Sequence, residues 1–378
     1  MPHPDWVQHL SIQLDPAVTF DHIPASHRGV FAHSPLPTDH IFARIPFSAL
    51  INVEHALVDP ELGAVLERNP SIPDPVCTAL LLAQLQLRGD SQWTSYLSWL
   101  PTELHTPVLW ETDQLKLLEG TSLLIEVHRR KSRIRELHNQ VLRAQLPQPL
   151  RISESELSWW LAILRSRLFG VDIQDGAGEW HHTHSLVPFA DALNTAPQPN
   201  TACWTEMSSR EFVCGTSRPV TAGEELTAPY GELLSHVVRC ASQSCILPSS
   251  ITNATGVNHT NRDYFLDYGF VSPQFEHLTV PVELLGLQLG DRASLRQALT
   301  ITPRRQLLAA ARKATSELGD GASSEMATDV RARYAHSIRH AERSTLGVLV
   351  ERLERLEEDD STQFISPSDG HIHHKQDL

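Results

Sequence analysis

The spacing of apolar residues along the 378-residue chain changes twice, from helical to strand-like and back. This order of helical and strand-rich stretches constrains the fold most. From about residue 74 to residue 168, apolar side chains recur three or four positions apart, which is the spacing of amphipathic helices. From about His184, short apolar runs alternate with turns rich in Gly and Pro. After Pro273 the helical spacing returns. The order predicts an α+β fold, in which a β-rich core is accompanied by separate helical parts.

Local signals predict where several helices begin and end. Asp74 followed by Pro75 has the pattern of an N-cap with proline at the first helical position, and Gly89 stops that helix. Ser153 and Glu156 form a capping box for the next one. Further helices are predicted over residues 112–146 and 327–358, and the acidic and then polar tail that follows is predicted to be disordered.

Short strands are predicted on both sides of the first helical block. They are runs of apolar and β-branched residues bounded by turn residues. The predicted strands are Gly29–His33, His40–Ile45, Leu186–Phe189, Glu211–Ser217 and Glu225–Ala228.

The charge balance narrows the possible partners. The formal net charge is −14, whereas direct binding of nucleic acid needs a basic surface. A basic segment of a protein substrate fits this chain better. No stretch of about 18 apolar residues predicts a membrane span, and residues 1–10 lack the pattern of a secretory signal. We therefore expect a cytoplasmic or nuclear protein, of an oligomeric state that the sequence leaves open.

The five cysteines are few, odd in number and lack the spacing of a zinc site. We predict no metal centre and free thiols in a reducing compartment. The chain also lacks a G-x-S-x-G elbow, a P-loop, an H-E-x-x-H helix and a G-x-G-x-x-G fingerprint. These absences exclude the best-known hydrolase, nucleotide-binding and metalloprotease signatures.

Three ordered segments carry a resemblance to a known family. They read HSLVPFADALNTAPQPNT from His184, EFVCGTSRPVTAGEELTAPYG from Glu211, and NRDYFLDYGFV from Asn261. Their order is similar to that of the C-terminal half of a SET domain of the class of the Rubisco large-subunit methyltransferase. Upstream, Arg28-Gly-Val-Phe-Ala32 resembles the entry strand of that class. Trp93-Thr-Ser-Tyr-Leu97 and Leu100-Pro-Thr-Glu-Leu104 resemble its inserted helical subdomain.

The resemblance implies a domain organisation. Residues 20–70 and 153–275 would form the two parts of a SET core, and residues 71–152 an inserted helical subdomain. Residues 276–358 would form a helical domain similar to a substrate-binding domain, followed by the disordered tail 359–378.

The resemblance also implies a site for S-adenosylmethionine. Arg28 and Gly29 would lie in the loop around its methionine end, and Asn194, preceded by Asp191, would hold the same end. An amide donates and accepts at once, which suits a group that carries both an ammonium and a carboxylate. Read locally, the alternatives are a permissive strand glycine at Gly29 and a turn-forming asparagine at Asn194.

Further site residues follow from the same comparison. Ser166 and Arg167 would edge the cofactor pocket, although they also fit an ordinary helix face. Tyr230, in a Tyr-Gly pair, would be the catalytic residue and would also contact the cofactor. Tyr268 and Phe270 would line the substrate channel, with Phe270 also at the cofactor face. The alternative for these two is a packed aromatic core.

Two features depart from the class pattern. Thr195 stands where a histidine with a mainly backbone contact to the adenine is usual, so Thr195 would take that place. Residues Glu232–Val257 separate the Tyr-Gly pair from the segment at Asn261. This stretch is either a substrate-facing loop or retained intron sequence.

We therefore predict a protein methyltransferase that uses S-adenosylmethionine and modifies the Nε atom of a lysine on a protein substrate. Histidine N-methylation is the alternative within enzymes. A non-catalytic SET module that serves as a binding scaffold is the alternative outside them, favoured by Thr195 and the insertion.

Overall fold

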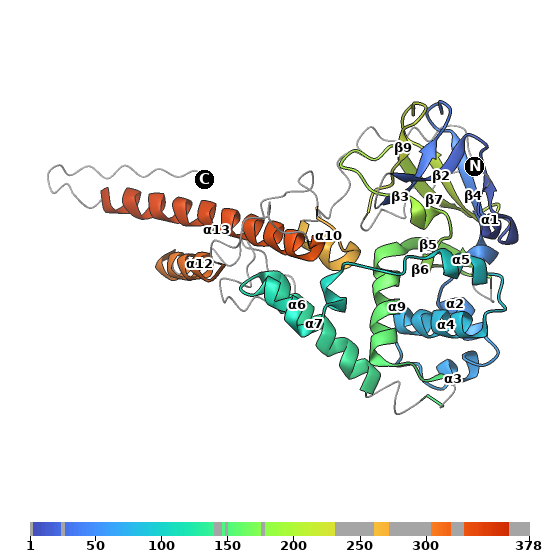
Figure 1. Ribbon diagram of the computed structural model, residues 1–378, viewed down its shortest axis with the longest axis horizontal. Helices are drawn as coiled ribbons and strands as arrows, with labels where there is room; N and C mark the ends of the chain where they lie inside the picture. The colour runs from blue at the N-terminus through green and yellow to red at the C-terminus, as the bar shows by residue number, and fades with distance from the viewer. Residues whose placement is uncertain are drawn as a thin grey trace. The chain divides into compact units, whose positions relative to one another are not determined.

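The computed structural model describes residues 3–23, 27–139, 146–147, 150–174, 178–230, 261–271, 304–318 and 329–362. The chain divides into two compact units. The first comprises Met1–Trp110 and Val127–Phe275, and the second comprises Glu111–Glu126 and Glu276–Leu378. One boundary between the units, after Glu126, falls inside helix α7, Ser122–Leu137, which Figure 1 labels.

Three antiparallel sheets form the strand-rich part of the first unit. The largest has the strand order β1-β4-β8-β7, the second the order β2-β3-β9, and the third is the hairpin β5-β6. In the second sheet, Val30 pairs with Leu226, so the early strand β3 lies beside β9, which comes much later in the chain. The strands are β1 Gln13–Leu14, β2 Val18–Ile23, β3 His27–Ala32, β4 Ile41–Pro46, β5 Leu168–Gln174, β6 Trp180–Leu186, β7 Thr201–Glu206, β8 Glu211–Thr216 and β9 Glu225–Leu226.

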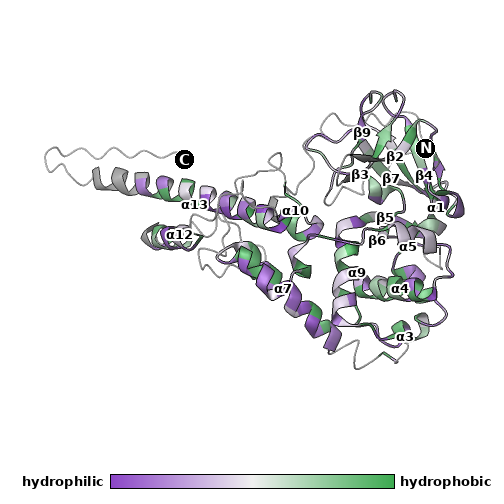
Figure 2. Cartoon of the chain, in the orientation of Figure 1, coloured by the Kyte–Doolittle hydropathy of each residue, from purple (hydrophilic) through white to green (hydrophobic). Residues whose placement is uncertain are grey.

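The helices of the first unit centre on α4, which packs against α2, α5 and α9. In Figure 2, α4 is mostly green, as befits a helix with apolar neighbours on several sides. The α-helices are α1 Asp5–His9, α2 Val53–Val58, α3 Gly63–Glu67, α4 Asp74–Arg88, α5 Thr94–Trp99, α9 Glu154–Arg167 and α10 Asn261–Tyr268. The 3-10 turns are η1 Phe47–Ala49, η2 Pro107–Leu109 and η6 Ala190–Ala192.

The capping signals in the sequence correspond to real helix ends. Ser153 and Glu156 form both hydrogen bonds of the predicted capping box at the start of α9. Gly89 ends α4 in the left-handed conformation, with φ +67°. The N-cap of α4 is Pro73, one residue before the Asp74 that the sequence indicated.

Two predicted elements differ most from the structure. The strand predicted over Leu186–Phe189 ends at Leu186, because the chain turns at Phe189, whose φ is +83°. The single helix predicted over 112–146 is interrupted: α6 and η3 end before Gly120, whose φ is +82°, and α7 begins afterwards. At Gly120, a Cβ would lie 2.9 Å from the carbonyl oxygen of Glu317, so the break needs a glycine.

The second unit is helical in its described part. Its core is apolar, and Leu307, Ala311, Leu346 and Leu349 are among the buried residues. The unit contains α6 Thr112–Leu115, η3 Lys116–Leu118, the first turn of α7, α12 Arg304–Leu318 and α13 Val330–Thr362. The last of these extends four residues into the segment 359–378 that was predicted as a tail; the remainder of that segment lies outside the described residues.

The prediction of an α+β fold is confirmed by this combination of antiparallel sheets and helices. Among the helices that the structure describes, none is long and apolar enough to cross a membrane.

Candidate active site

A buried ion pair lies at the centre of the candidate site. The sequence ends α9 at Arg167, and the turn η6 carries Asp191. One guanidinium nitrogen of Arg167 donates to both the backbone oxygen and Oδ2 of Asp191, each at 2.9 Å. The side chain of Arg167 is 18 % exposed and that of Asp191 is fully buried. Burial works against the Arg167 cation, yet the carboxylate of Asp191 keeps its pKa raised.

Tyr96, on α5, completes a network around the same carboxylate. Its hydroxyl donates to Oδ2 of Asp191 at 2.8 Å, and the side chain is completely buried. Burial, and next the charge of Asp191, raise the pKa of Tyr96 well above its usual value. The hydroxyl is therefore a permanent donor at physiological pH.

This network is incomplete. Nε of Arg167 and Oδ1 of Asp191 are buried and have no hydrogen-bond partner. A buried polar atom without a partner costs about 1–3 kcal/mol. One donor and one acceptor therefore remain for a ligand that can supply the opposite groups.

A second cation lies close to this pair. Arg28, in β3, stacks over the ring of Trp99 with its guanidinium carbon 4.6 Å from the ring centroid, and it donates to the Trp99 carbonyl at 2.5 Å. Burial lowers the pKa of Arg28, as does the charge of Arg167, while Asp191 acts in the opposite direction. Two guanidinium groups thus lie near the Asp191 carboxylate, and a second carboxylate, that of Glu225, contacts Asn194 in the same site.

Asn194 connects the strand β3 to β9. Its side-chain nitrogen donates to the backbone oxygen of Arg28 at 2.9 Å and to Oε1 of Glu225 at 2.6 Å. Gly29 leaves room for this contact, because a Cβ at that position would lie 2.5 Å from Oε1 of Glu225 and 3.2 Å from Nδ2 of Asn194. A side chain at residue 29 would displace the amide.

Tyr230 lies directly beside this arrangement. Its hydroxyl donates to the backbone oxygen of Leu193 at 2.9 Å, one residue before Asn194. Burial raises the pKa of Tyr230 to about 12, partly against the opposing effect of the Arg167 cation. The group is therefore a neutral hydroxyl at physiological pH, far from the pKa near 7 that suits a general base.

An aromatic cluster surrounds Tyr230. Its ring stacks on that of Tyr268, with centroids 4.6 Å apart and planes at 23°. Tyr264 contacts both Tyr268 and Phe270, at centroid distances of 5.8 and 5.4 Å. Gly269, between two of these rings, has φ +79° and lies so close to the chain at Thr106 that a Cβ would be 2.8 Å from its amide nitrogen.

The structure brings most of the predicted residues into one place. Arg28, Gly29, Arg167, Asp191 and Asn194 are connected by direct contacts or by charge, and Tyr230 is adjacent through Leu193. Tyr268 and Phe270 join Tyr230 through the aromatic cluster.

Two predicted residues are linked to the site only because they are adjacent in sequence to Arg167 or Asn194. Ser166 precedes Arg167, but its hydroxyl donates to the carbonyl of Ile163 within its own helix. Thr195 follows Asn194 and is half-buried. The roles of all these residues stay predictions.

The sequence did not reveal three further members of the site. Tyr96, Trp99 and Glu225 lie far from their partners along the chain, so no local pattern pairs them. The Trp93-Thr-Ser-Tyr96 motif marked Tyr96 as noteworthy, and the Gly-Glu-Glu turn contains Glu225, but neither pattern indicates the contact it makes.

Residues Glu232–Val257 lie outside the described part, so the choice between a loop and retained intron sequence stays open.

Cys203 and Cys214 face each other across β7 and β8, with Cα atoms 4.2 Å apart, and form a disulfide. The prediction of free thiols is therefore wrong for this pair. A reducing compartment would instead favour the reduced form, with two thiols. Within the described residues, no metal-binding cluster of three or more His, Cys, Asp or Glu residues occurs.

Comparison with known proteins gives distant relatives. No family model matches the chain. It is 24 % identical over 263 residues to a chloroplastic ribulose-1,5 bisphosphate carboxylase/oxygenase large subunit N-methyltransferase of Nicotiana tabacum, covering 65 % of this chain and 45 % of that protein. It is 22 % identical over 276 residues to SET domain-containing protein 4 of Mus musculus, covering 68 % and 55 %. The matches thus span about half the length of these relatives.

Solved structures match over almost the whole chain. The SET domain of LSMT bound to MeLysine and AdoHcy gives a TM-score of 0.67 at 18 % identity, covering 94 % of this chain and 91 % of that one. Rubisco LSMT bound to AdoMet gives a TM-score of 0.65 at 18 % identity, with the same coverage. At this identity the likeness establishes the fold.

Proposed function

We propose that this chain, which has the fold of the SET domain of Rubisco LSMT, transfers a methyl group from S-adenosylmethionine to a protein substrate. One observation carries the proposal. The buried pair of Arg167 and Asp191, beside Asn194 and Tyr230, keeps one donor and one acceptor without a protein partner.

These residues fit the methionine end of S-adenosylmethionine, which carries an ammonium and a carboxylate. Oδ1 of Asp191 could accept from the ammonium, and Nε of Arg167 could donate to the carboxylate, so the two unsatisfied atoms match the two charges. The second guanidinium, on Arg28, supports a bound carboxylate as well. Gly29 keeps the strand beside Asn194 free of a side chain.

The cofactor would supply a methyl group activated on a sulfonium sulfur. This chain would then have to present a neutral amine in line with the bond that breaks, and such alignment contributes several kcal/mol. Tyr230 is suited to orient that amine because its hydroxyl stays protonated and is fixed against the Leu193 carbonyl.

A lysine amine needs to lose its proton before it can react. At pH near 7.4 this costs about 4 kcal/mol, since the free pKa lies roughly three units higher. Apolar surroundings reduce that cost by disfavouring the ammonium. The aromatic rings of Tyr264, Tyr268 and Phe270 around Tyr230 could provide such surroundings, which supports lysine Nε as the acceptor.

Two alternatives follow from the same site. An imidazole could occupy the aromatic surroundings, which would make the protein a histidine N-methyltransferase. A non-catalytic scaffold would have the same fold and would bind protein segments without turnover. We place the protein in the cytoplasm or nucleus, with residues 276–358 as the substrate-binding-like domain.

Calorimetry with S-adenosylmethionine tests the cofactor. The chain should bind it, and Asn194→Ala should weaken binding at least about ten-fold, because the amide fixes Gly29 and Glu225. Asn69→Ala is the matched control, since it removes an amide that bonds only to Val65 within its own turn. A folded wild-type chain that gives no heat would refute the methyltransferase proposal.

Tyr230→Phe tests the catalytic residue. The variant loses only the hydroxyl, so cofactor affinity should persist while turnover falls about 10²-fold or the degree of methylation changes. Tyr334→Phe, in the helical unit, is the matched control. Unchanged kinetics of Tyr230→Phe on an identified substrate would assign the orienting role to another group.

A further inference from the structure

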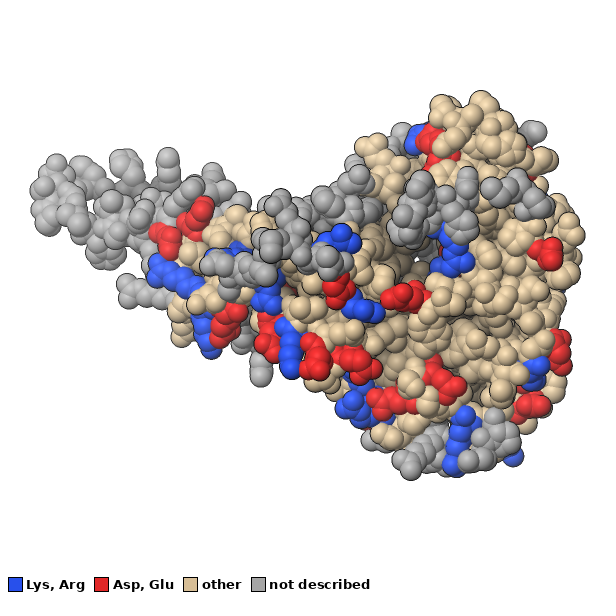
Figure 3. All heavy atoms as spheres, in the orientation of Figure 1, with Lys and Arg blue, Asp and Glu red and all other residues tan. Residues whose placement is uncertain are grey.

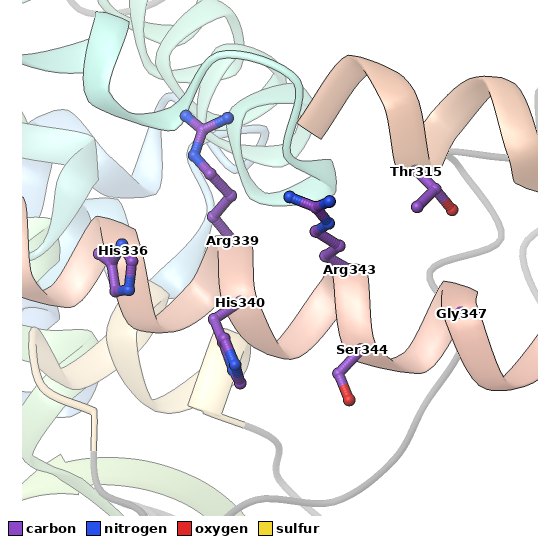
Figure 4. A pocket seen from close by; sticks show the side chains of 7 residues that line it. All are labelled: Thr315, His336, Arg339, His340, Arg343, Ser344 and Gly347. Carbon is purple, nitrogen blue, oxygen red and sulfur yellow. The ribbon is translucent and has the colours of Figure 1, made fainter. Parts of the chain in front are cut away.

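Outside the candidate site, the described chain has a cavity, a charged surface and a disulfide. The cavity, of about 420 Å³, lies against α12 and α13, and Figure 4 shows Arg339, His340 and Arg343 among its lining residues. Arg339 is already bonded to the carbonyl oxygens of Leu318 and Leu117. No lining residue has a large apolar side chain, so the cavity lacks the apolar wall of an ordinary ligand pocket.

The charged surface of the second unit is of mixed sign. On the face shown in Figure 3, Lys and Arg side chains lie among Asp and Glu side chains over its described helices. A partner of one charge is selected by a patch of the opposite charge, and this face offers no such patch among the described residues. The disulfide between Cys203 and Cys214 is therefore the feature that carries further chemistry.

The strands β7 and β8 hold these two cysteines opposite each other whether or not their sulfurs are bonded. Cys203 pairs with Cys214 inside a ladder of six residue pairs that begins at Thr201 and Thr216. Their Cα distance of 4.2 Å is that of a pair at which the side chains of antiparallel strands approach most closely. Because the backbone ladder maintains this register, the S–S bond can break and form again in the folded chain.

The two sulfurs differ in access. Cys214 is fully buried in β8, which lies between β4 and β7 in its sheet. Cys203 is half-buried in β7, the last strand of the same sheet. Thiol–disulfide exchange depends on which sulfur an attacking thiolate can reach. Attack at Cys203 is therefore favoured, and Cys214 is the leaving group.

The start of β7 is bonded to the segment that leads into the candidate site. The amide and the hydroxyl of Thr201 both donate to the carbonyl of Thr227, at 3.1 and 2.9 Å. The side chain of Asn200 donates to the carbonyl of Glu225 and accepts from the amide of Thr227, each at 2.8 Å. Asn200, Thr201 and Thr227 are buried. The position of residues 225–228 therefore depends on β7 staying in place.

The same segment holds Asn194. The amide of Ala228 donates to the Asn194 carbonyl at 2.8 Å, and Oε1 of Glu225 accepts from Nδ2 of Asn194 at 2.6 Å. Tyr230 follows two residues after Ala228. Among the described strands, β7 pairs with β8 alone, so the disulfide between them limits how often β7 opens.

We propose that Cys203 and Cys214 form a reversible redox modification site, at which a dithiol reduces the disulfide and thereby loosens β7 and residues 225–228. In the oxidised form this segment holds Asn194 firmly, and in the reduced form the affinity for the cofactor falls. The effect on the cofactor rests on the proposed function, whereas the modification and the loosening do not.

The exchange transfers two electrons and two protons to the protein. One thiol of the reductant loses its proton and attacks Sγ of Cys203, and Cys214 leaves as a thiolate and takes up a proton. The second thiol of the reductant loses its proton and displaces Cys203 from the mixed disulfide, and Cys203 is protonated in turn. The dithiol becomes a disulfide. Oxidation of the protein by a disulfide follows the same steps in reverse.

The test uses the full chain with Cys77→Ala, Cys240→Ser and Cys245→Ser, so that only the proposed pair can react. Oxidised glutathione or reduced dithiothreitol sets the redox state, and alkylation followed by mass spectrometry detects free thiols. The reduced form should melt at least about 5 °C below the oxidised form. Cys203→Ser in the same background is the matched control and should melt at one temperature in both buffers. If that variant does not fold, Cys214→Ala replaces it.

Hydrogen exchange measures the loosening without any cofactor. After reduction, the amides of Thr227 and Ala228 should exchange at least about three-fold faster, while those of α4 stay unchanged. Calorimetry with S-adenosylmethionine should give an affinity at least about three-fold lower for the reduced form.

Three outcomes would overturn the inference. They are a pair that stays reduced in oxidised glutathione, a disulfide that dithiothreitol does not break in the folded chain, and equal exchange of Thr227 and Ala228 in both forms. Equal cofactor affinity of the two forms would overturn the link to the site. A chain that binds no cofactor in either form refutes the proposed function instead, and the exchange rates then decide this inference alone.

Discussion

Each unit of the protein contains a buried carboxylate, and the two differ in how completely they are bonded. Asp191 in the first unit bonds to Tyr96 and Arg167 through Oδ2, while its Oδ1 has no partner. Glu342 in the second unit accepts from the Ser122 backbone amide through Oε2, at 3.0 Å, and from the Ser122 hydroxyl through Oε1. It thereby caps the start of α7.

The difference distinguishes a carboxylate in a binding site from a carboxylate that only stabilises the fold. Folding alone satisfies both oxygens of Glu342, so its surroundings need no ligand. At Asp191 an acceptor stays buried and unsatisfied, which costs about 1–3 kcal/mol unless a ligand donates to it. Removing each carboxylate should therefore have different consequences for stability and for cofactor binding.

Asp191→Ala should have the largest effect. It leaves the buried Arg167 cation without its partner, which typically costs about 3–5 kcal/mol. We expect the melting temperature to fall by roughly 10 °C and binding of S-adenosylmethionine to disappear. Calorimetric melting with and without the cofactor measures both. A variant as stable as the wild type would show that the pair contributes nothing to the fold.

The sequence indicated one side of this network better than the other. Asp191 and Asn194 stand together in an ordered motif, and Arg28-Gly29 in another, so a family resemblance was enough to select them. Tyr96 reaches Asp191 across 95 residues, and Glu225 reaches Asn194 across 31. Such contacts depend on how α5 and β9 pack, which no periodicity or cap encodes.

Alkaline pH should weaken the first unit through the same network. The pKa values of Tyr96 and Tyr230 are raised above their unfolded value near 10, that of Tyr230 to about 12. Their contribution to stability is complete below pH 10 and declines as pH rises above it, and that of Tyr230 is lost as pH rises through about 12. For Tyr230 it amounts to roughly 3 kcal/mol, from two units at about 1.4 kcal/mol each.

Melting temperatures between pH 9 and pH 12 measure this loss. Tyr230→Phe cannot ionise, so it should show a shallower decline than the wild type. Tyr334 in the helical unit also has a pKa raised by burial, which makes Tyr334→Phe the comparison between the units. An identical decline in Tyr230→Phe and wild type would contradict the assignment to Tyr230.

Helix boundaries show the same limit of sequence reasoning. The capping box of Ser153 and Glu156 was visible because its members are three residues apart. The break before α7 was missed, although Gly120 was a local signal for it. Its positive φ is enforced by the approach to Glu317, almost two hundred residues away, and the flanking apolar spacing resembled one continuous helix.

Glu342→Ala should have a smaller effect, confined to the second unit. It leaves the buried amide and hydroxyl of Ser122 without their acceptor, which costs about 2 kcal/mol. The affinity for S-adenosylmethionine should not change, in contrast to Asp191→Ala. Glu342→Gln, which retains an acceptor, should recover part of the stability. A loss of cofactor affinity in Glu342→Ala would show that Glu342 is not purely structural, and would contradict its distinction from Asp191.

Gly347→Ala should have the smallest effect, and the opposite sign. Glycine within a helix is about 0.5–1 kcal/mol less favourable than alanine, because the unfolded chain loses more freedom when it folds. No atom lies within 4 Å of the added methyl group, so nothing in the described unit opposes the change. The helical unit should therefore melt at a slightly higher temperature. A lower melting temperature would mean that this space is filled in the folded protein.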